Sequence, residues 1–315
     1  MSTQRLGFRG TEDLGGGLKA LFQVESTMTA GGAASNGFGS RPTFVGLAGN
    51  FGTVLLGRQD TPLLKTTAAQ LAGGSNNLVG QAIYSNFGLG FDGTAVTAAQ
   101  TTAAGYGRMA TDTTTDKAIN YISPTIAGFT AEVQVGQSDT KDDTGTAPAF
   151  SKTDDTGFSL RYVAGPLTVS GANHTKEFTT SVASSATVFP GKTKTNYIGA
   201  TYDLVAAKVS LQHATSKNDT TVASVFDNKV TQLGVQVPVT TAINLFGSVG
   251  MGTRTLETVD EYKQTSMQLG ATYSLSKRTM LYSVYGQQEL KGDNTATAGE
   301  KLKETQFALG VRHTF

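Results

Sequence analysis

The sequence predicts an all-β fold, an antiparallel up-and-down β-barrel that crosses a membrane with its strands. Three observations predict it: about fifteen segments of alternating apolar and polar residues, connections that alternate between short and long, and charged residues on one strand face. Alternation with period two is typical of a strand whose faces meet different surroundings. Because no composition break divides it, we interpret the chain as one domain, residues 1–315.

Composition supports this class and excludes others. The chain has 38 glycines, no cysteine, no tryptophan, 16% charged residues and a net charge of +1. Glycine and threonine are poor helix formers, so a helix-rich fold is disfavoured. A net charge near zero argues against nucleic-acid binding, and the lack of cysteine excludes disulfides and thiolate metal sites. No apolar run reaches the roughly 18 residues of a transmembrane helix.

The alternation is clearest in four segments. Leu6 and Phe8 alternate with arginines near the start, and Phe307, Leu309 and Val311 alternate with polar or small residues at the end. Segments beginning at 129 and 156 repeat the pattern. The full set of predicted strands is 4–12, 18–26, 41–48, 53–60, 115–123, 129–138, 156–164, 167–177, 194–204, 207–215, 228–237, 242–254, 265–275, 278–290 and 303–315.

The connections sort by length. Short turns follow the odd segments and long polar loops follow the even ones, so the short connections lie at one end of the sheet and the long loops at the other. This asymmetry is typical of bacterial outer-membrane barrels, and a soluble sandwich has no physical reason for it. The predicted long loops are 27–40, 61–114, 139–155, 178–193, 216–227, 255–264 and 291–302.

The charged residues of the strands indicate a wet interior. A dry core could not hold several arginines without a large desolvation cost, whereas a water-filled pore can. Barrels of about 16–18 strands enclose such a channel. The candidates for this inner, pore-lining face are Arg5, Arg9, Arg58, Arg161, Arg312 and Glu132.

The strand count is odd, which predicts a further strand. The first and last segments run in the same direction, so they could close only in parallel, whereas single-chain bacterial barrels are antiparallel and even-numbered. We therefore expect one more strand, and a signal peptide, before residue 4, since Met1–Arg5 has no apolar stretch. A weak segment missed in the count is the alternative.

The connection 61–114 is too long for an ordinary loop. It keeps scattered apolar residues, which favours a loop folded into the pore against the wall, where it sets the size limit. A surface lid or an oligomer contact is the alternative. The apolar residues are Leu71, Leu78, Val79, Ile83, Tyr84, Phe87, Leu89 and Phe91, and the charged residues are Lys65, Asp92, Arg108 and Asp112.

Basic residues cluster before this loop. Arg5, Arg9, Arg41 and Arg58 lie in the first four segments, and Glu25 is one of the few acids of matching parity. Basic pore linings favour anions, so we expect a locally positive constriction, to which Arg108 and Asp112 of the loop are added as candidates. Aromatic residues near strand ends are typical of interfacial girdles. They are Phe44, Phe129, Tyr162, Tyr197, Tyr202, Tyr273, Tyr282 and Phe315.

Five stretches together resemble the general porins of Gram-negative outer membranes, in their beta-proteobacterial branch. They occur in order from one end of the chain to the other. They are Arg5 to Ser26, Gly49 to Gln59, Asn120 to Phe129, Leu275 to Tyr282 and Gly310 to Phe315. The resemblance implies a 16-stranded homotrimeric channel of the outer membrane, for passive diffusion of small hydrophilic solutes and ions, with no cofactor. It also supports the missing first strand and the inward fold of 61–114.

The resemblance implies roles for single residues. Arg5 and Arg41 match eyelet residues of anion-selective members, and Phe315 matches the terminal aromatic that the barrel assembly machinery recognises. A further eyelet arginine of the family would fall near Thr114, where this chain has none; Arg108 lies six residues upstream. The resemblance therefore implies only a weak preference for anions.

Other functions remain as alternatives. A surface adhesin that conducts nothing would use the long loops as a binding face. An enzyme in a barrel would need a Ser–His or Asp–His constellation, and His174, His213 and His313 lie far apart in the sequence. No metal site and no nucleic-acid partner are expected. The acidic stretch 139–155 is interpreted as a solvated loop that divalent cations could bridge to lipopolysaccharide.

Overall fold

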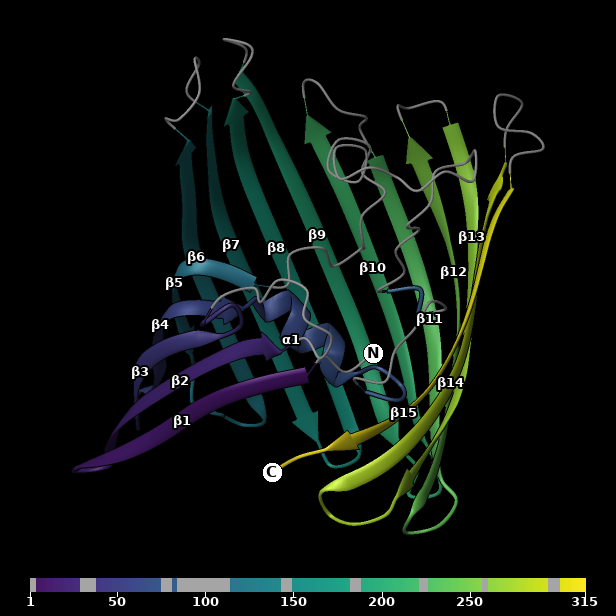
Figure 1. The fold of residues 1–315 in the computed structure, drawn as a ribbon, viewed down its shortest axis with the longest axis horizontal. Coiled ribbons are helices and arrows are strands. Elements are labelled where there is room, and N and C mark those ends of the chain that lie inside the picture. Colours follow the sequence, from purple (N-terminus) through teal and green to yellow (C-terminus); the bar gives the residue numbers. More distant parts are fainter. Residues whose placement is uncertain are drawn as a thin grey trace.

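A single curved sheet contains all the described strands (Figure 1). The computed structural model describes residues 4–28, 38–74, 81–83, 114–142, 149–181, 188–220, 226–256, 260–293 and 301–315. The elements are β1 (Gln4–Gly15), β2 (Leu18–Met28), β3 (Thr43–Gly49), β4 (Gly52–Asp60), α1 (Pro62–Ala69), β5 (Thr114–Ile122), β6 (Phe129–Asp142), β7 (Ala149–Ala164), β8 (Leu167–Ser181), β9 (Val188–Asp203), β10 (Lys208–Thr220), β11 (Phe226–Pro238), β12 (Ile243–Leu256), β13 (Asp260–Ser274), β14 (Thr279–Gly292) and β15 (Lys301–His313).

The topology is an up-and-down meander, as predicted. The fifteen strands pair in sequence order, every neighbouring pair is antiparallel, and each matches one predicted segment. Figure 1 shows the sheet curling around a hollow that holds α1. Strands β1 and β15 form the two edges of this sheet and do not pair with each other. We call the end that joins β1 to β2 the turn end, and the opposite end the loop end.

Several strands run further than predicted toward the loop end. Strand β6 continues to Asp142 instead of 138, and β7 begins at Ala149 instead of 156. The backbone ladder continues there because cross-strand bonds do not require apolar side chains. The prediction of an acidic loop over 139–155 is therefore wrong in large part. Asp139 and Asp154 are strand residues, and they form ion pairs with Lys117 and Lys152.

The two strand faces have opposite character, as predicted. Outward-facing Ile198 and Leu211 are 59% and 54% exposed, whereas the inward-facing Gln212 and Gln232 are fully buried. The apolar face thus points out and the polar face points in, the reverse of a soluble barrel. Of the aromatic residues expected at interfaces, Tyr197 is instead a buried inner residue.

The long connection after β4 contains a helix that the sequence reading treated as loop. Thr61 caps it, accepting a hydrogen bond from the Leu64 amide (3.1 Å), and Pro62 occupies the first turn. Both residue types favour a helix start, because the cap satisfies a free amide and proline lacks one. No helix of the described residues is long and apolar enough to cross a membrane.

Phe246 of β12 is the largest apolar side chain of a small core inside the sheet. It is 2% exposed and packs with Ala72 of the long connection and Val284 of β14. Gly73 and Gly270 leave room for the ring, since a Cβ at either position would lie within 2.4 Å of it. The core therefore joins the connection after β4 to the far side of the sheet.

We expect Phe246→Ala to lower the free energy of unfolding by about 3–5 kcal/mol, because it leaves a cavity where the ring now packs. Denaturant unfolding of the refolded protein in detergent measures this. The control is Leu245→Ala, the next residue, whose side chain faces outward and is 43% exposed. Equal losses in the two variants would contradict the inner packing of Phe246.

Candidate pore lining and constriction

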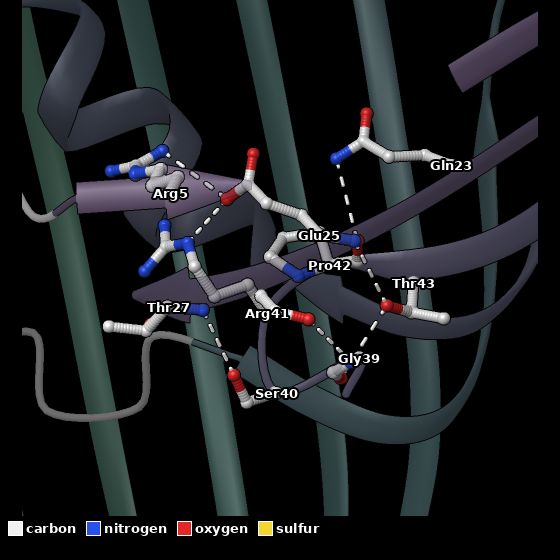
Figure 2. Close-up of polar contacts among 10 residues, drawn as sticks. Arg5, Gln23, Glu25, Thr27, Gly39, Ser40, Arg41, Pro42 and Thr43 are labelled. Atoms are coloured by element: carbon white, nitrogen blue, oxygen red, sulfur yellow. Dashed lines mark hydrogen bonds and ion pairs between the residues drawn. The ribbon is translucent and has the colours of Figure 1, made fainter. Parts of the chain in front are cut away.

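Arg5, Glu25 and Arg41 meet on the inner face of the sheet (Figure 2). Arg5 Nη1 lies 3.5 Å from Glu25 Oε1, and Arg41 Nε forms an ion pair with the same oxygen. The side chains of Glu25 and Arg41 are 21% and 23% exposed, so the cluster is half-buried. Two guanidinium groups thus share one carboxylate, and the cluster keeps one net positive charge.

Local pairing explains how these residues meet. In the β1–β2 ladder, Gly7 lies opposite Glu25, so Arg5 and Glu25 share a face. The chain returning toward β3 is fixed to β2 by hydrogen bonds that include Arg41 N to Glu25 O (3.0 Å), Thr27 N to Ser40 Oγ (3.1 Å) and Gly39 N to Ser26 Oγ (2.8 Å). These bonds bring Arg41 to the carboxylate.

Three other sequence candidates lie on the inner face but outside this cluster. Arg9 lies opposite Gln23, Arg161 lies opposite the buried Ser170, and Arg312 follows the outward-facing Val311. No contact in the described part of the chain joins Arg9 or Arg161 to the cluster. These arginines therefore spread positive charge over the wall instead of concentrating it.

Arg58 does not line the pore, contrary to the sequence prediction. Its guanidinium bonds Asp116 and Thr114 Oγ1 (3.0 Å), the residues on either side of Thr115. Thr115 is buried and faces inward, where its methyl group lies against Gly136. An irregularity in the β4–β5 ladder, opposite Lys117, changes the register at this point. Val54 and Leu56 of β4 face outward in the same alternation, so Arg58 also lies on the outer side of the wall.

Helix α1 is tied to the inner wall by an ion pair. Lys65 Nζ lies 2.5 Å from Glu132 Oε1 on β6, and Asn120 Nδ2 of β5 donates to the same oxygen at 2.7 Å. Glu132 is 9% exposed and lies on the inner face of the sheet, where the helix covers it. The carboxylate of Asp60, at the end of β4, interacts electrostatically with Arg41 and Lys65.

Gln70, which caps the end of α1, anchors the connection to β8, β9 and β10. Its Nε2 donates to Ser170 Oγ (3.0 Å) and to Gly199 O (3.3 Å). Its side-chain oxygen accepts from the Tyr197 hydroxyl (2.7 Å), and its backbone carbonyl accepts from Gln212 Nε2 (3.1 Å). Gln70 is 3% exposed, so this network is shielded from water.

The described residues 81–83 continue along the wall to β11 and β12. Ile83 N donates to Gln232 Oε1 (3.3 Å), and Gln232 Nε2 donates to Gln81. Ala82 lies against Gly250, where an added Cβ would be 2.2 Å from the alanine methyl. The connection after β4 therefore crosses the hollow of the sheet from β6 to β12.

The sequence reading missed the residues that hold this connection. Gln70, Gln212 and Gln232 were not singled out, although glutamines at inward parity are a signal for polar packing. Leu71 and Ile83 are buried, as expected for an inward fold. Arg108 and Asp112 lie outside the described residues, as do the other apolar residues named for this loop: Leu78, Val79, Tyr84, Phe87, Leu89 and Phe91.

An Asp–His pair also lies in the wall, although the sequence reading found none. Asp155 Oδ1 of β7 is 3.2 Å from His174 Nε2 of β8, and both side chains are nearly buried. Within the described chain, no group of three or more His, Asp or Glu side chains is arranged to hold a metal ion. The Asp155–His174 contact is a pairing of two side chains within the wall.

We expect Gln70→Ala to loosen the constriction without unfolding the sheet. The change removes the side-chain amide that bonds Ser170, Gly199 and the Tyr197 hydroxyl, and a buried polar group left without its partner costs about 1–3 kcal/mol. Single-channel recordings should show noisier or larger current steps, and denaturant unfolding should show the loss of stability. Gln137→Ala is the control, because Gln137 faces outward and bonds only Asp154 (2.7 Å). Unchanged currents in both variants would argue against an anchoring role for Gln70.

Comparison with known proteins identifies the family. The model of the Gram-negative porin family matches residues 1–293. The chain is 32% identical to outer membrane porin protein 32 of Delftia acidovorans, over 100% of this chain and 85% of the relative.

Similar solved structures support the same assignment. An anion-selective porin from Comamonas acidovorans superposes with a TM-score of 0.69 and 26% identity, covering 100% of this chain and 90% of that one. The trimer form of OmpT from Vibrio cholerae shares the fold, with a TM-score of 0.68, 15% identity, and 99% and 91% coverage. The curled antiparallel sheet, its polar hollow and the inward connection are thus those of a porin, and the chain belongs to the Gram-negative porin family of outer-membrane channels.

Proposed function

We propose that residues 61–114 form the constriction of a water-filled channel for small hydrophilic solutes and ions. The observation that carries the proposal is the anchoring of α1, residues 70–74 and residues 81–83 across the hollow of the sheet, through Lys65, Gln70 and Ile83. A connection held at three points, on β6, on β8 to β10 and on β11, narrows the passage and stays in place while solutes pass. Transport then follows the concentration gradient and involves no chemical step.

We further infer that the channel prefers anions. Around the inward helix, four cations (Arg5, Arg9, Arg41 and Lys65) face three acids (Glu25, Asp60 and Glu132), which leaves a net charge of +1. Arg161 and Arg312 add to this on the inner wall. Fixed charges in a narrow aqueous passage act on ions before bulk water can screen them. The anion-selective porin from Comamonas acidovorans supports the same sign.

We propose that the protein assembles as a homotrimer through the outer side of β1 to β4. Strand β3 has seven residues, which span about 23 Å along the strand and less when tilted, short of the apolar band of about 25 Å. An apolar groove lies here, lined among others by Phe22, Val45 and Leu47, and the Arg58–Asp116 pair faces the same side. A neighbouring protein subunit would cover such a surface better than lipid chains would.

Two further contacts follow from the outer-membrane setting. Phe315 is fully exposed beyond β15, so a terminal aromatic is available to the barrel assembly machinery during insertion. The outer wall at the loop end meets the outer leaflet, which consists of lipopolysaccharide. We propose both as partners of the chain.

Charge substitutions in the cluster test the selectivity. We expect Arg41→Glu to shift the reversal potential under a salt gradient toward cations, and Glu25→Gln to shift it toward anions, because each changes the net charge of the passage. The anion-to-cation permeability ratio should change by about twofold or more, as expected for one charge in a pore. Arg58→Gln is the control and should leave the ratio unchanged. A shift with Arg58→Gln equal to that with Arg41→Glu would refute this assignment.

Single cysteines test the proposed assembly surface, since the chain has none of its own. Val45→Cys and Ile198→Cys form a matched pair, because the native side chains are 58% and 59% exposed in one chain. In the assembled protein, an apolar maleimide should label Cys at 198 readily and Cys at 45 slowly. After dissociation into monomers, both should label alike. Equal labelling of the assembled protein would place the contact elsewhere.

A further inference from the structure

Four lysines gather on the outer wall at the loop end of β9, β10 and β11. Lys192, Lys194, Lys217 and Lys229, with Asp219 and Asp227, line an open groove of about 390 Å³, which we call the lysine groove. These side chains point outward, because the residues between them, such as Thr195, Asn218 and Asn228, are buried on the inner face. The lysine groove therefore contributes nothing to the pore and faces the surroundings of the barrel.

Two of these lysines repel each other in the structure. Lys194 and Lys217 lie directly opposite in the β9–β10 ladder, where like charges are destabilising. Lys192 forms an ion pair with Glu177, and Lys229 lies 3.7 Å from Asp227. Within the described chain, neither Lys194 nor Lys217 has a carboxylate within ion-pair distance. The four lysines and two aspartates that line the lysine groove carry a net charge of +2, and Glu177, which is paired with Lys192, lowers this to +1.

The height of the lysine groove fits a lipid headgroup. Outward-facing Ile198 and Leu233 mark the apolar part of the wall, and Lys194 and Lys229 lie four residues further toward the loop end on the same strands. Four residues of strand span about 13 Å. The ammonium groups thus lie beyond the apolar band, at the level where lipid phosphates meet water.

We propose that the lysine groove binds the phosphorylated headgroup of lipopolysaccharide, with Lys194 and Lys217 on one phosphate. A phosphate between the two ammonium groups replaces their repulsion by two charge-assisted hydrogen bonds. Basic surface clusters recognise anionic lipids by this chemistry. The inference rests on the lipopolysaccharide contact proposed above and assigns residues to it. Lysines make the contact, in place of the divalent cations expected at the acidic stretch, whose Asp139 and Asp154 are already paired.

The chain supplies a matched control at the same end of the barrel. Lys263, Lys291 and Lys301 also lie opposite one another across β13, β14 and β15. There, however, Lys263 pairs with Asp293 (2.7 Å) and Lys301 pairs with Glu289 (2.9 Å). Two of these three lysines are thus neutralised within the protein, so this row should hold a phosphate weakly.

The test is a titration of the refolded full chain in detergent with bisphosphorylated lipid A, followed by native mass spectrometry. We expect Lys194→Gln/Lys217→Gln to weaken binding by roughly tenfold, from the loss of two surface charges. The control Lys263→Gln/Lys301→Gln should stay within about twofold of the unsubstituted protein, as for exposed paired charges. Lipid A without phosphates should bind the unsubstituted protein and the groove variant alike, and more weakly than the bisphosphorylated form.

Three outcomes would overturn the proposal. Equal weakening in both double variants would indicate only the general charge of the rim. Unchanged binding in the groove variant would remove the lysine groove from the contact. Displacement of lipid A by millimolar inorganic phosphate would indicate a site for free anions. Conductance is measured on the same samples, and it should be unchanged, so a failure of this proposal is distinguishable from a failure of the channel.

Discussion

The pairing of backbone amides and carbonyls across neighbouring strands is the constraint on which the rest of the structure depends. Hydrocarbon contains no water that could bond an unpaired amide or carbonyl, so each unpaired backbone group would cost several kcal/mol. The continuous antiparallel ladder from β1 to β15 meets this need over the described chain. With the backbone satisfied by its neighbours, the side chains are free to differ completely between the two faces.

The inner face uses that freedom to build a polar interior. Gln212 and Gln232 are fully buried, yet both bond the connection after β4, which carries their partners Gln70 and Gln81. Apolar contacts such as that of Phe246 with Ala72 supplement these bonds. The hydrogen bonds of such a network are directional, so they hold the connection in one position more rigidly than an apolar contact of similar area would. The charged cluster of Arg5, Glu25 and Arg41 then keeps a defined place beside an aqueous passage.

The outer face is not uniform, and its differences correspond to different surroundings. Over much of the wall, residues such as Ile198 and Leu211 present apolar surface suited to lipid chains. At the short strands β3 and β4, the outer face carries an apolar groove and the partly exposed Arg58–Asp116 pair, a combination suited to protein. At the loop end of β9 to β11, unneutralised lysines suit phosphate. The outward-facing residues of one alternating pattern are therefore suited to lipid chains, to protein and to phosphate in three different regions.

The sequence by itself determined the number, order and faces of the strands, because period-two alternation is a local property of the chain. It also indicated the inward connection, from apolar residues such as Ile83, and a group of basic residues in the first four strands that includes Arg5 and Arg41. Only the tertiary structure decided which residues hold the connection, since Gln70 meets Tyr197 from 127 positions away. It also paired Asp155 of β7 with His174 of β8. These outcomes depend on register and on contacts between distant strands, which local alternation does not encode.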